Sequence, residues 1–393
     1  ILGGSIGCGA FANISTINSI VIDNNVKSFD SYAFYNCSSL SEINIPDMSA
    51  IYEGTFSGCS NLQNVVIPNS VENIGANAFR DCTKLVSVCI GDENGLTKTI
   101  GDYAFAGCSN LKTVSMFNLT EIASYAFSGC FRLRISDLPA SLETLGDYAF
   151  AGCLSIYSIK LHNNILNAGQ RVFDNCSKLI EIYNSTNTFK IDIDSVLGNA
   201  NPKVIHSSSS EASIIDSSNK DFLFVTLNEK KYLLAYEGTD ANPIVPTDIG
   251  NYAIRKYAFA YNNTLTHLTL PECVVKVEAN AIYLCSKLEY LSATNAITFE
   301  ANFANYSNVD VFNFVGSLED WLSYNFSDVD CNPMHCADEF WLNGDKLTSL
   351  VIPENVTTIN EYSFAVCTSL TSFTIPDNIK RIPPYALYNC TGL

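Results

Sequence analysis

The segment CNPMHC holds the residues best suited to bind a metal. Cys331, His335 and Cys336 are ligand types that zinc prefers, and they lie within a few residues of one another. Structural zinc needs four ligands, usually completed by a second clustered pair, and the sequence has no such pair. Nor does it contain an Asp-rich calcium loop. A disulfide or plain thiols explain this segment better, so we expect no metal.

The other ionisable residues form no catalytic pattern. The chain has four histidines, at positions His162, His206, His267 and His335. None is accompanied by a serine elbow or a cysteine motif at a telling spacing. Asp192 and Asp194 share one strand face, whereas glycosidase carboxylates oppose each other across a cleft. A glycine-rich phosphate loop is also missing. We therefore expect no catalytic residue, no cofactor and no enzyme activity.

Cysteine is unusually frequent, with 15 residues in the chain. Ten of them follow an aromatic or aliphatic residue by three positions, and they are Cys37, Cys59, Cys82, Cys108, Cys130, Cys153, Cys176, Cys285, Cys367 and Cys390. One position repeated ten times is a packing position and not a disulfide framework. Because free cysteine is small and readily buried, we expect a column of reduced thiols in the core. The cysteine count therefore does not indicate a redox compartment.

The residues that precede these cysteines reveal a repeat of about 23 residues. Its aromatic position is occupied by Phe11, Phe34, Phe56, Phe79, Phe105, Phe127, Phe150 and Phe173, after a first long gap by Phe259, Ile282 and Phe303, and after a second by Phe364 and Leu387. One such unit cannot bury its own apolar edge, so the units must stack. The sequence therefore predicts a solenoid.

Each unit contains a short strand and a turn segment. Leu40, Ile43 and Ile45 follow the L-x-x-L-x-L spacing of a leucine-rich repeat, and Pro46 ends the strand because it has no amide donor. The segment GDYAFAGCSNL is too short for a long helix, so we expect a turn or two of α- or 3-10 helix. The predicted fold is a curved, right-handed α/β repeat solenoid with a parallel sheet on one face and short helical turns on the other.

The outward positions of the strands are mostly small and polar. They include the pairs Glu42 and Asn44, Asn64 and Val66, Glu181 and Tyr183, His267 and Thr269, and Tyr290 and Ser292. A solvated β-surface explains this pattern, and a mildly acidic protein-binding face explains it too. In the second case Tyr183, His267 and Tyr290 are the natural anchors, because aromatic residues dominate binding hot spots.

Composition limits the partners. The 393-residue chain has a net charge of -18 and an isoelectric point near 4.5, which argues against nucleic acids and anionic membranes. It contains no apolar run of transmembrane length, so we expect no direct membrane insertion. The chain starts without Met and stops partway into a unit, so we expect a fragment of a longer protein.

Two long gaps interrupt the repeat. We expect an N-terminal array at 1–202, a hairpin-containing insert at 203–250, continuing repeats at 251–305, a helix and hairpin insert at 306–346, and C-terminal repeats at 347–393. In the second insert, Ser317 and Asp320 predict a helix N-cap, and Asn343-Gly344 predicts a type I′ turn. The inserts elaborate one solenoid in this interpretation; the alternative is a linker between two stacks.

Both tryptophans, Trp321 and Trp341, belong to the second insert. They are candidate ligand-binding residues, because tryptophan is favoured at binding hot spots. The alternative is that they form the small core beneath the insert.

The phenylalanine–cysteine–proline unit resembles the BspA-type leucine-rich repeat of surface proteins from bacteria and some parasitic protists. The resemblance covers residues 10–206 and 251–393, with the ten in-register cysteines as its most specific feature. The pattern departs from it where Val196 and Asn199 replace Phe and Cys, and where Tyr306 replaces Cys. It implies a secreted or surface-displayed adhesion protein that binds an extracellular or host protein. The alternative function is carbohydrate binding through the inserts and their tryptophans.

Overall fold

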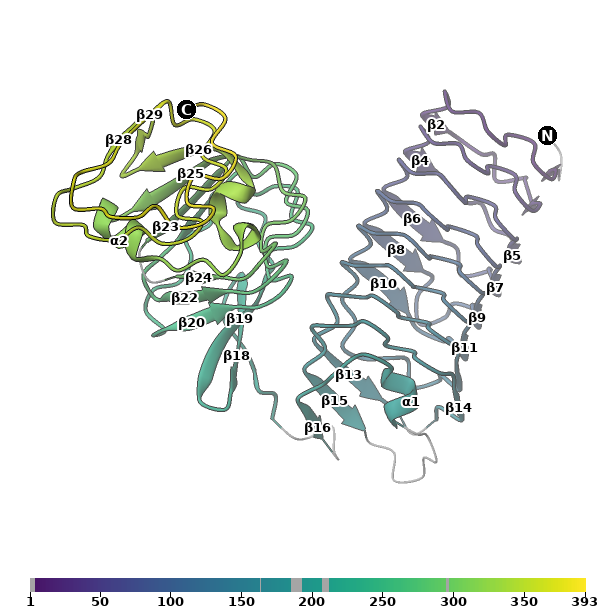
Figure 1. Cartoon of the computed structure of the whole chain (residues 1–393). Helices are drawn as coiled ribbons and strands as arrows, with labels where there is room; N and C mark the ends of the chain where they lie inside the picture. Colours follow the sequence, from purple (N-terminus) through teal and green to yellow (C-terminus); the bar gives the residue numbers. More distant parts are fainter. Residues whose placement is uncertain (1–3, 163, 185–192, 207–211, 295–296) are drawn as a thin grey trace. The chain divides into compact units, whose positions relative to one another are not determined.

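The computed structural model describes residues 4–162, 164–184, 193–206, 212–294 and 297–393. The chain forms two compact units, Ile1–Ala212 and Ser213–Leu393. Each unit is a β-solenoid with its own hydrophobic core (Figure 1). The boundary between the two units falls within the insert expected at residues 203–250.

In the first unit, the strands of the repeat stack in parallel along one side, which we call the strand face (Figure 1). They are β2 (Ser19–Ile20), β4 (Glu42–Ile43), β6 (Asn64–Ile67), β8 (Ser87–Ile90), β10 (Thr113–Met116), β13 (Ser158–Leu161), β15 (Glu181–Asn184) and β16 (Val204–His206). In β6, Val65 and Ile67 are buried whereas Asn64 and Val66 are exposed, which is the alternation expected of a strand with one covered face.

A second parallel stack of very short strands was not predicted. It comprises β1 (Ser5–Ile6), β3 (Ser28–Phe29), β5 (Ala50–Ile51), β7 (Asn73–Ile74), β9 (Thr99–Ile100), β11 (Glu121–Ile122), β12 (Thr144–Leu145) and β14 (Asn167–Ala168). Six of these strands, β5, β7, β9, β11, β12 and β14, form one sheet. Gly101 follows β9 because a Cβ atom there would lie 2.8 Å from the backbone nitrogen of Ala76 in the preceding coil.

The turn segments join the two stacks and form a third side, the turn face. They are not helical, contrary to prediction, except in the degenerate unit that carries α1 (Ile193–Leu197). Tyr103 (φ 57°) and Gly107 (φ 74°) are left-handed, which a helix does not allow. As a result, alternate N–H groups point along the solenoid axis and bond to the next coil, as in Phe105 N–H to Ala126 O at 2.8 Å.

Aromatic and cysteine side chains fill the space behind the turn face. From Phe11 to Phe173 the phenylalanine rings stack in one column, with neighbouring centroids 5.1–5.7 Å apart. All 15 cysteines are free. In nine of the ten repeat positions the thiol donates to the carbonyl oxygen of the phenylalanine or its equivalent one coil earlier, at 2.9–3.3 Å. The predicted thiol column is therefore present.

The second unit has the same two kinds of sheet. The lateral sheet, which corresponds to the second stack of short strands in the first unit, contains β17 (Ile215–Asn219), β18 (Phe222–Leu227), β19 (Lys230–Tyr236), β20 (Tyr252–Ile254), β22 (Val274–Val277) and β24 (Thr298–Phe299). The predicted hairpin is confirmed: β18 and β19 are antiparallel, and β19 pairs in parallel with β20. The hairpin thus lies at the N-terminal end of the array and covers the edge of β20.

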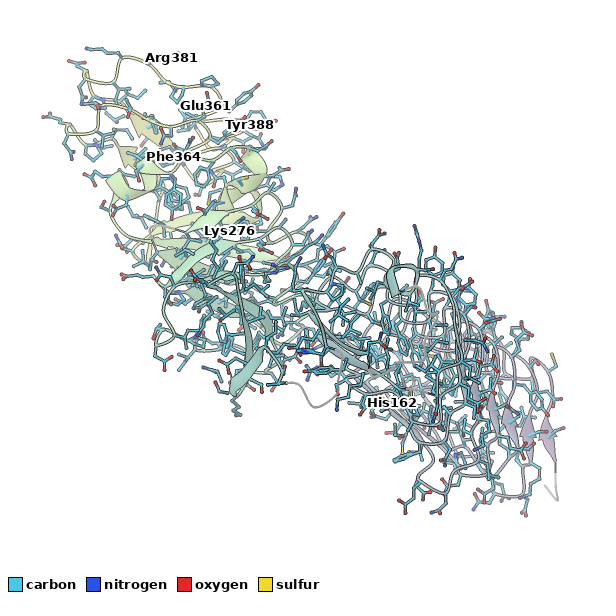
Figure 2. The ribbon with its side chains drawn as sticks, turned by 90° about the horizontal axis from the view of Figure 1, so that it is seen from below. His162, Lys276, Glu361, Phe364, Arg381 and Tyr388 are labelled. Atoms are coloured by element: carbon cyan, nitrogen blue, oxygen red, sulfur yellow. The ribbon has the colours of Figure 1, made fainter. Side chains whose placement is uncertain are left out.

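The strand face of the second unit contains β21 (His267–Leu270), β23 (Tyr290–Thr294), β25 (Val309–Val315), β26 (Ala337–Leu342) and β27 (Asp345–Lys346), followed by β28 (Ser349–Val351) and β29 (Ser372–Thr374). The short helices of this unit are α2 (Leu318–Ser323), η1 (Val329–Cys331) and η2 (Pro333–His335). Ser317 and Asp320 form the predicted capping box of α2, and Asn343 and Gly344 have the positive φ of a type I′ turn. Figure 2 shows Phe364 among the core side chains and Arg381 at the periphery.

The coil that starts at Asn302 corrects one detail of the predicted register. Ala304 occupies the aromatic position in place of Phe303, and Ser307 occupies the cysteine position in place of Tyr306. The Ser307 hydroxyl donates to the Ile282 carbonyl, as the thiols do elsewhere, and accepts from the Cys285 N–H at 3.0 Å. A hydroxyl therefore substitutes for the thiol at this position.

The thiol column predicts a sharp difference in reactivity. Burial raises the pKa of Cys59 and Cys176 to about 12, so at pH 8 these thiols are protonated as well as inaccessible. We expect N-ethylmaleimide to modify the exposed Cys8 and Cys89 in the native chain, and the buried column thiols, which are all but the half-buried Cys390, only after unfolding. Peptide mapping by mass spectrometry measures this, and column thiols that react as fast as Cys89 would contradict the fold.

Candidate functional site: the strand face of the second unit

One open sheet face brings together three of the five predicted ligand-binding residues. In register across neighbouring parallel strands lie His267 of β21, Tyr290 of β23, Val311 of β25 and Glu339 of β26. The intervening residues of each strand are buried, so these side chains face away from the core. We call His267, Tyr290, Val311, Glu339, Trp341 and Lys346 the aromatic strand face.

His267 and Tyr290 form an aromatic pair. Their ring centroids are 5.5 Å apart, and the rings are tilted by 30°. His267 is exposed and its Nδ1 lies 3.0 Å from the Thr266 hydroxyl, whereas Tyr290 is half-buried. Because a rigid sheet holds the two rings side by side, their side chains would lose little conformational entropy when a partner binds.

At the other end of the aromatic strand face, the Glu339 carboxylate binds both Trp341 and Lys346. Glu339 accepts a hydrogen bond from Trp341 Nε1–H at 2.9 Å and pairs with Lys346 Nζ at 2.6 Å. The hydrogen bonds from Lys346 and from Trp341 lower the pKa of this carboxyl below its usual value. The half-buried Trp341 ring is therefore fixed in orientation by a charged partner.

A buried polar network places Lys346 next to the sheet. Asn313 Nδ2 donates to the Ser292 hydroxyl at 3.1 Å, and the Gly344 N–H donates to Asn313 Oδ1 at 2.8 Å. The network fastens the Asn343-Gly344 turn, and with it β27, to the centre of the face. Nothing in the sequence near Asn313 indicates these long-range hydrogen bonds.

Tyr183 does not belong to an exposed surface, contrary to the prediction. Its side chain is only 6% exposed, donates to Glu181 Oε2 at 3.2 Å and stacks on His206 at 4.4 Å. Glu181 and His206 are also buried. Tyr183 points outward from its strand, but in this structure it is not available as a surface anchor.

Trp321 is a core residue. It is 1% exposed, packs against Phe312, Phe314 and Phe340, and donates from Nε1 to the Ser363 carbonyl at 2.9 Å. This corresponds to the alternative in which a tryptophan forms the core beneath the insert. Trp321 therefore has no free ring face for a sugar.

The CNPMHC segment divides into separate environments. The Cys331 thiol lies 3.3 Å from the Ser327 hydroxyl, the Cys336 thiol donates to the Pro333 carbonyl, and His335 Nε2 lies 3.4 Å from Asp330 Oδ1. Burial raises the pKa of Cys336 to about 12, which disfavours the thiolate that a metal requires. Within the described ranges no three His, Cys, Asp or Glu side chains could hold a metal together. Both cysteines are plain thiols.

The first unit contributes one feature that sequence analysis missed. At its N-terminal end the strand face has an apolar hollow of about 650 Å³, lined by residues of β2, β4 and β6. Val21 and Val66 line it and are 90% and 67% exposed. Single valines at outward strand positions are common, so the sequence alone gave no reason to select them.

The repeat pattern matches a known family. The model of the BspA type leucine rich repeat region matches residues 4–98, 98–218, 241–340 and 337–393. No curated protein matches the chain.

Several solved structures are similar to this chain. A leucine-rich repeat protein from Bacteroides ovatus is 22% identical, with 99% of this chain and 81% of that chain covered and a TM-score of 0.33. A leucine rich cell surface protein from Faecalibacterium prausnitzii is 19% identical, with 96% and 86% covered and a TM-score of 0.32. A leucine rich repeat protein from T. pallidum is 27% identical over 33% of this chain and 71% of its own, with a TM-score of 0.29. Because these TM-scores are low, the family assignment rests on the repeat model.

The pairing of Glu339 predicts a pH dependence. Its pKa is lower in the folded state than in the unfolded state, so the pairing stabilises the fold above the unfolded pKa, and this contribution is lost as pH falls through the folded pKa. We expect the Trp341 indole N–H resonance to shift with a midpoint below about 4.3, the usual glutamate value. Lys346→Ala should raise this midpoint. A wild-type midpoint at or above the usual value would contradict the geometry.

Proposed function

The chain belongs to the BspA-type leucine-rich repeat family, and on this premise we propose that it is a non-enzymatic interaction protein of the cell surface or the secreted fraction. Its aromatic strand face binds an extracellular protein, such as a protein of a host. The observation that carries this proposal is the open five-stranded sheet face on which His267, Tyr290 and Trp341 are half-exposed or exposed.

The chemistry of this face supports a protein as the partner. It combines aromatic rings with one salt bridge, Glu339–Lys346, and a central aliphatic side chain, Val311. Protein interfaces have this composition, in which aromatic anchors carry most of the binding energy and charged pairs at the rim give specificity. The sheet holds the anchors rigidly, so the partner meets a preorganised surface.

An extracellular setting agrees with the type of repeat and with the composition. The unit resembles repeats of surface proteins, and the net charge of -18 favours solubility and disfavours nucleic acid. No helix among the described residues has the length and apolar character needed to cross a bilayer.

The test is a binding measurement with a panel of purified extracellular-matrix and serum proteins, immobilised for surface plasmon resonance. We expect at least one to bind, and Tyr290→Ala and Trp341→Ala each to weaken binding by about 2 kcal/mol, a roughly thirtyfold rise in Kd. Both variants shorten a side chain at an outward position, so the fold should persist.

Tyr388→Ala is the matched control. Tyr388 is also a half-exposed tyrosine, but it lies in the last turn segment and not on the strand face (Figure 2). Loss of binding in this control, or unchanged binding in both strand-face variants, would sink the assignment of the surface. If no protein of the panel binds the folded chain, the proposed class of partner is wrong.

A further inference from the structure

The ladder of hydrogen bonds along the turn face is interrupted after the coil that starts at Asn302. In the preceding coil the N–H groups of Asn280, Ile282 and Leu284 all donate to carbonyls of the next coil, at 2.8–3.1 Å. In the Asn302 coil only Asn302 finds such a partner, the Asp330 carbonyl at 3.0 Å. Ala304 and Tyr306, which correspond to Ile282 and Leu284, donate to no group in the part of the chain that the structure describes.

The interruption has a clear structural cause. The next regular turn segment starts only at Tyr362, and the second insert occupies the space before it. Asn332, at the junction of η1 and η2, is buried and donates to the Tyr362 carbonyl at 2.7 Å. The insert thus holds the two coils apart, and Ala304 and Tyr306 line a pocket of about 350 Å³ at this interruption.

The walls of this pocket are polar and chemically mixed. Polar side chains make up much of its lining, among them those of Asn302, Asn305, Asn308, Asp330, His335 and Asp338. Asn302 Nδ2 donates to Asp330 Oδ2 at 3.2 Å, which fixes this carboxylate as an acceptor. Two carboxylates disfavour an anion, and the polar walls disfavour an apolar ligand. A ligand with many hydroxyl groups can satisfy both the donors and the acceptors.

An aromatic row leads to the pocket along the turn face. Tyr306 lines the pocket and is 69% exposed, and its ring meets Tyr283 edge-on, with centroids 5.6 Å apart. Tyr283 in turn contacts Tyr257 and Tyr261. Tyrosine presents an apolar ring and a polar tip, so it can cover the C–H face of a sugar while its hydroxyl remains hydrated.

We propose that this pocket binds a neutral mono- or disaccharide unit of a glycan. The Ala304 and Tyr306 N–H groups donate to its oxygens, Asp330 and Asp338 accept from its hydroxyls, and Tyr306 covers one face of a ring. The volume lies at the lower end of small-molecule sites, which are about 300–1,000 Å³. This binding is separate from the protein contact on the strand face.

The test is saturation-transfer difference NMR with glucose, galactose, mannose, fucose and N-acetylglucosamine, each alone, and with triglycine. We expect transfer to at least one sugar and none to triglycine. Tyr306→Asn and Asp338→Asn should each reduce the affinity about tenfold or more, the loss typical of one buried polar or aromatic contact. Asparagine suits position 306 because it tolerates the positive φ of 56°.

Tyr385→Asn is the matched control, since Tyr385 is also exposed and left-handed (φ 57°) but does not line the pocket. The control and the strand-face variant Tyr290→Ala should retain sugar binding, which separates this inference from the proposed protein contact. Absence of transfer to all five sugars by the folded chain overturns the proposal, and so does transfer that both pocket variants retain. Binding of triglycine that both variants abolish would assign the pocket to peptides instead.

Discussion

The fold depends on how the backbone polar groups of the turn face are paired. A coil of a solenoid leaves N–H and C=O groups on its two flanks, and the next coil must satisfy them because buried backbone groups require partners. Left-handed residues such as Tyr103 and Gly107 turn alternate N–H groups along the axis, where the carbonyls of the next coil accept them. This ladder sets the spacing between coils. At that spacing the phenylalanine rings of neighbouring coils stack and fill the core, and the thiols pair with carbonyl oxygens that the ladder does not use.

The same constraint shows where recognition can develop. A regular array offers a repeated and mostly polar surface, so distinctive chemistry arises where the repeat varies or breaks. On the strand face of the second unit, variation places His267, Tyr290 and Trp341 on one open sheet, with Glu339 and Lys346 as their charged partners. On the turn face, the second insert interrupts the ladder and creates a polar pocket beside Tyr306. The two surfaces meet at β26, which carries Asp338 of the pocket and Glu339 and Trp341 of the strand face, but their chemistry suits different ligands.

The sequence predicted what depends on spacing within one unit. The phenylalanine and cysteine register, the strands, the β18–β19 hairpin, the Ser317 capping box and the Asn343-Gly344 turn are all local patterns, and the structure contains them. It did not predict the lateral sheet, whose two-residue strands are too short to produce a periodic pattern. The left-handed tyrosines were missed because hydrogen bonds between coils, which a single unit does not reveal, favour this conformation over a helix. Likewise, the shift that places Ala304 and Ser307 in register, and the burial of Tyr183 and Trp321, depend on contacts distant in sequence.

Amide hydrogen exchange of the native chain, resolved residue by residue, tests this account most directly. If pairing between coils holds the turn face together, the Ile282 and Leu284 amides, which donate to the next coil, should be protected. The corresponding Ala304 and Tyr306 amides have no acceptor among the described residues and should exchange about 100-fold faster or more. Equal protection of the four amides would contradict both the role of the ladder and its interruption at the pocket.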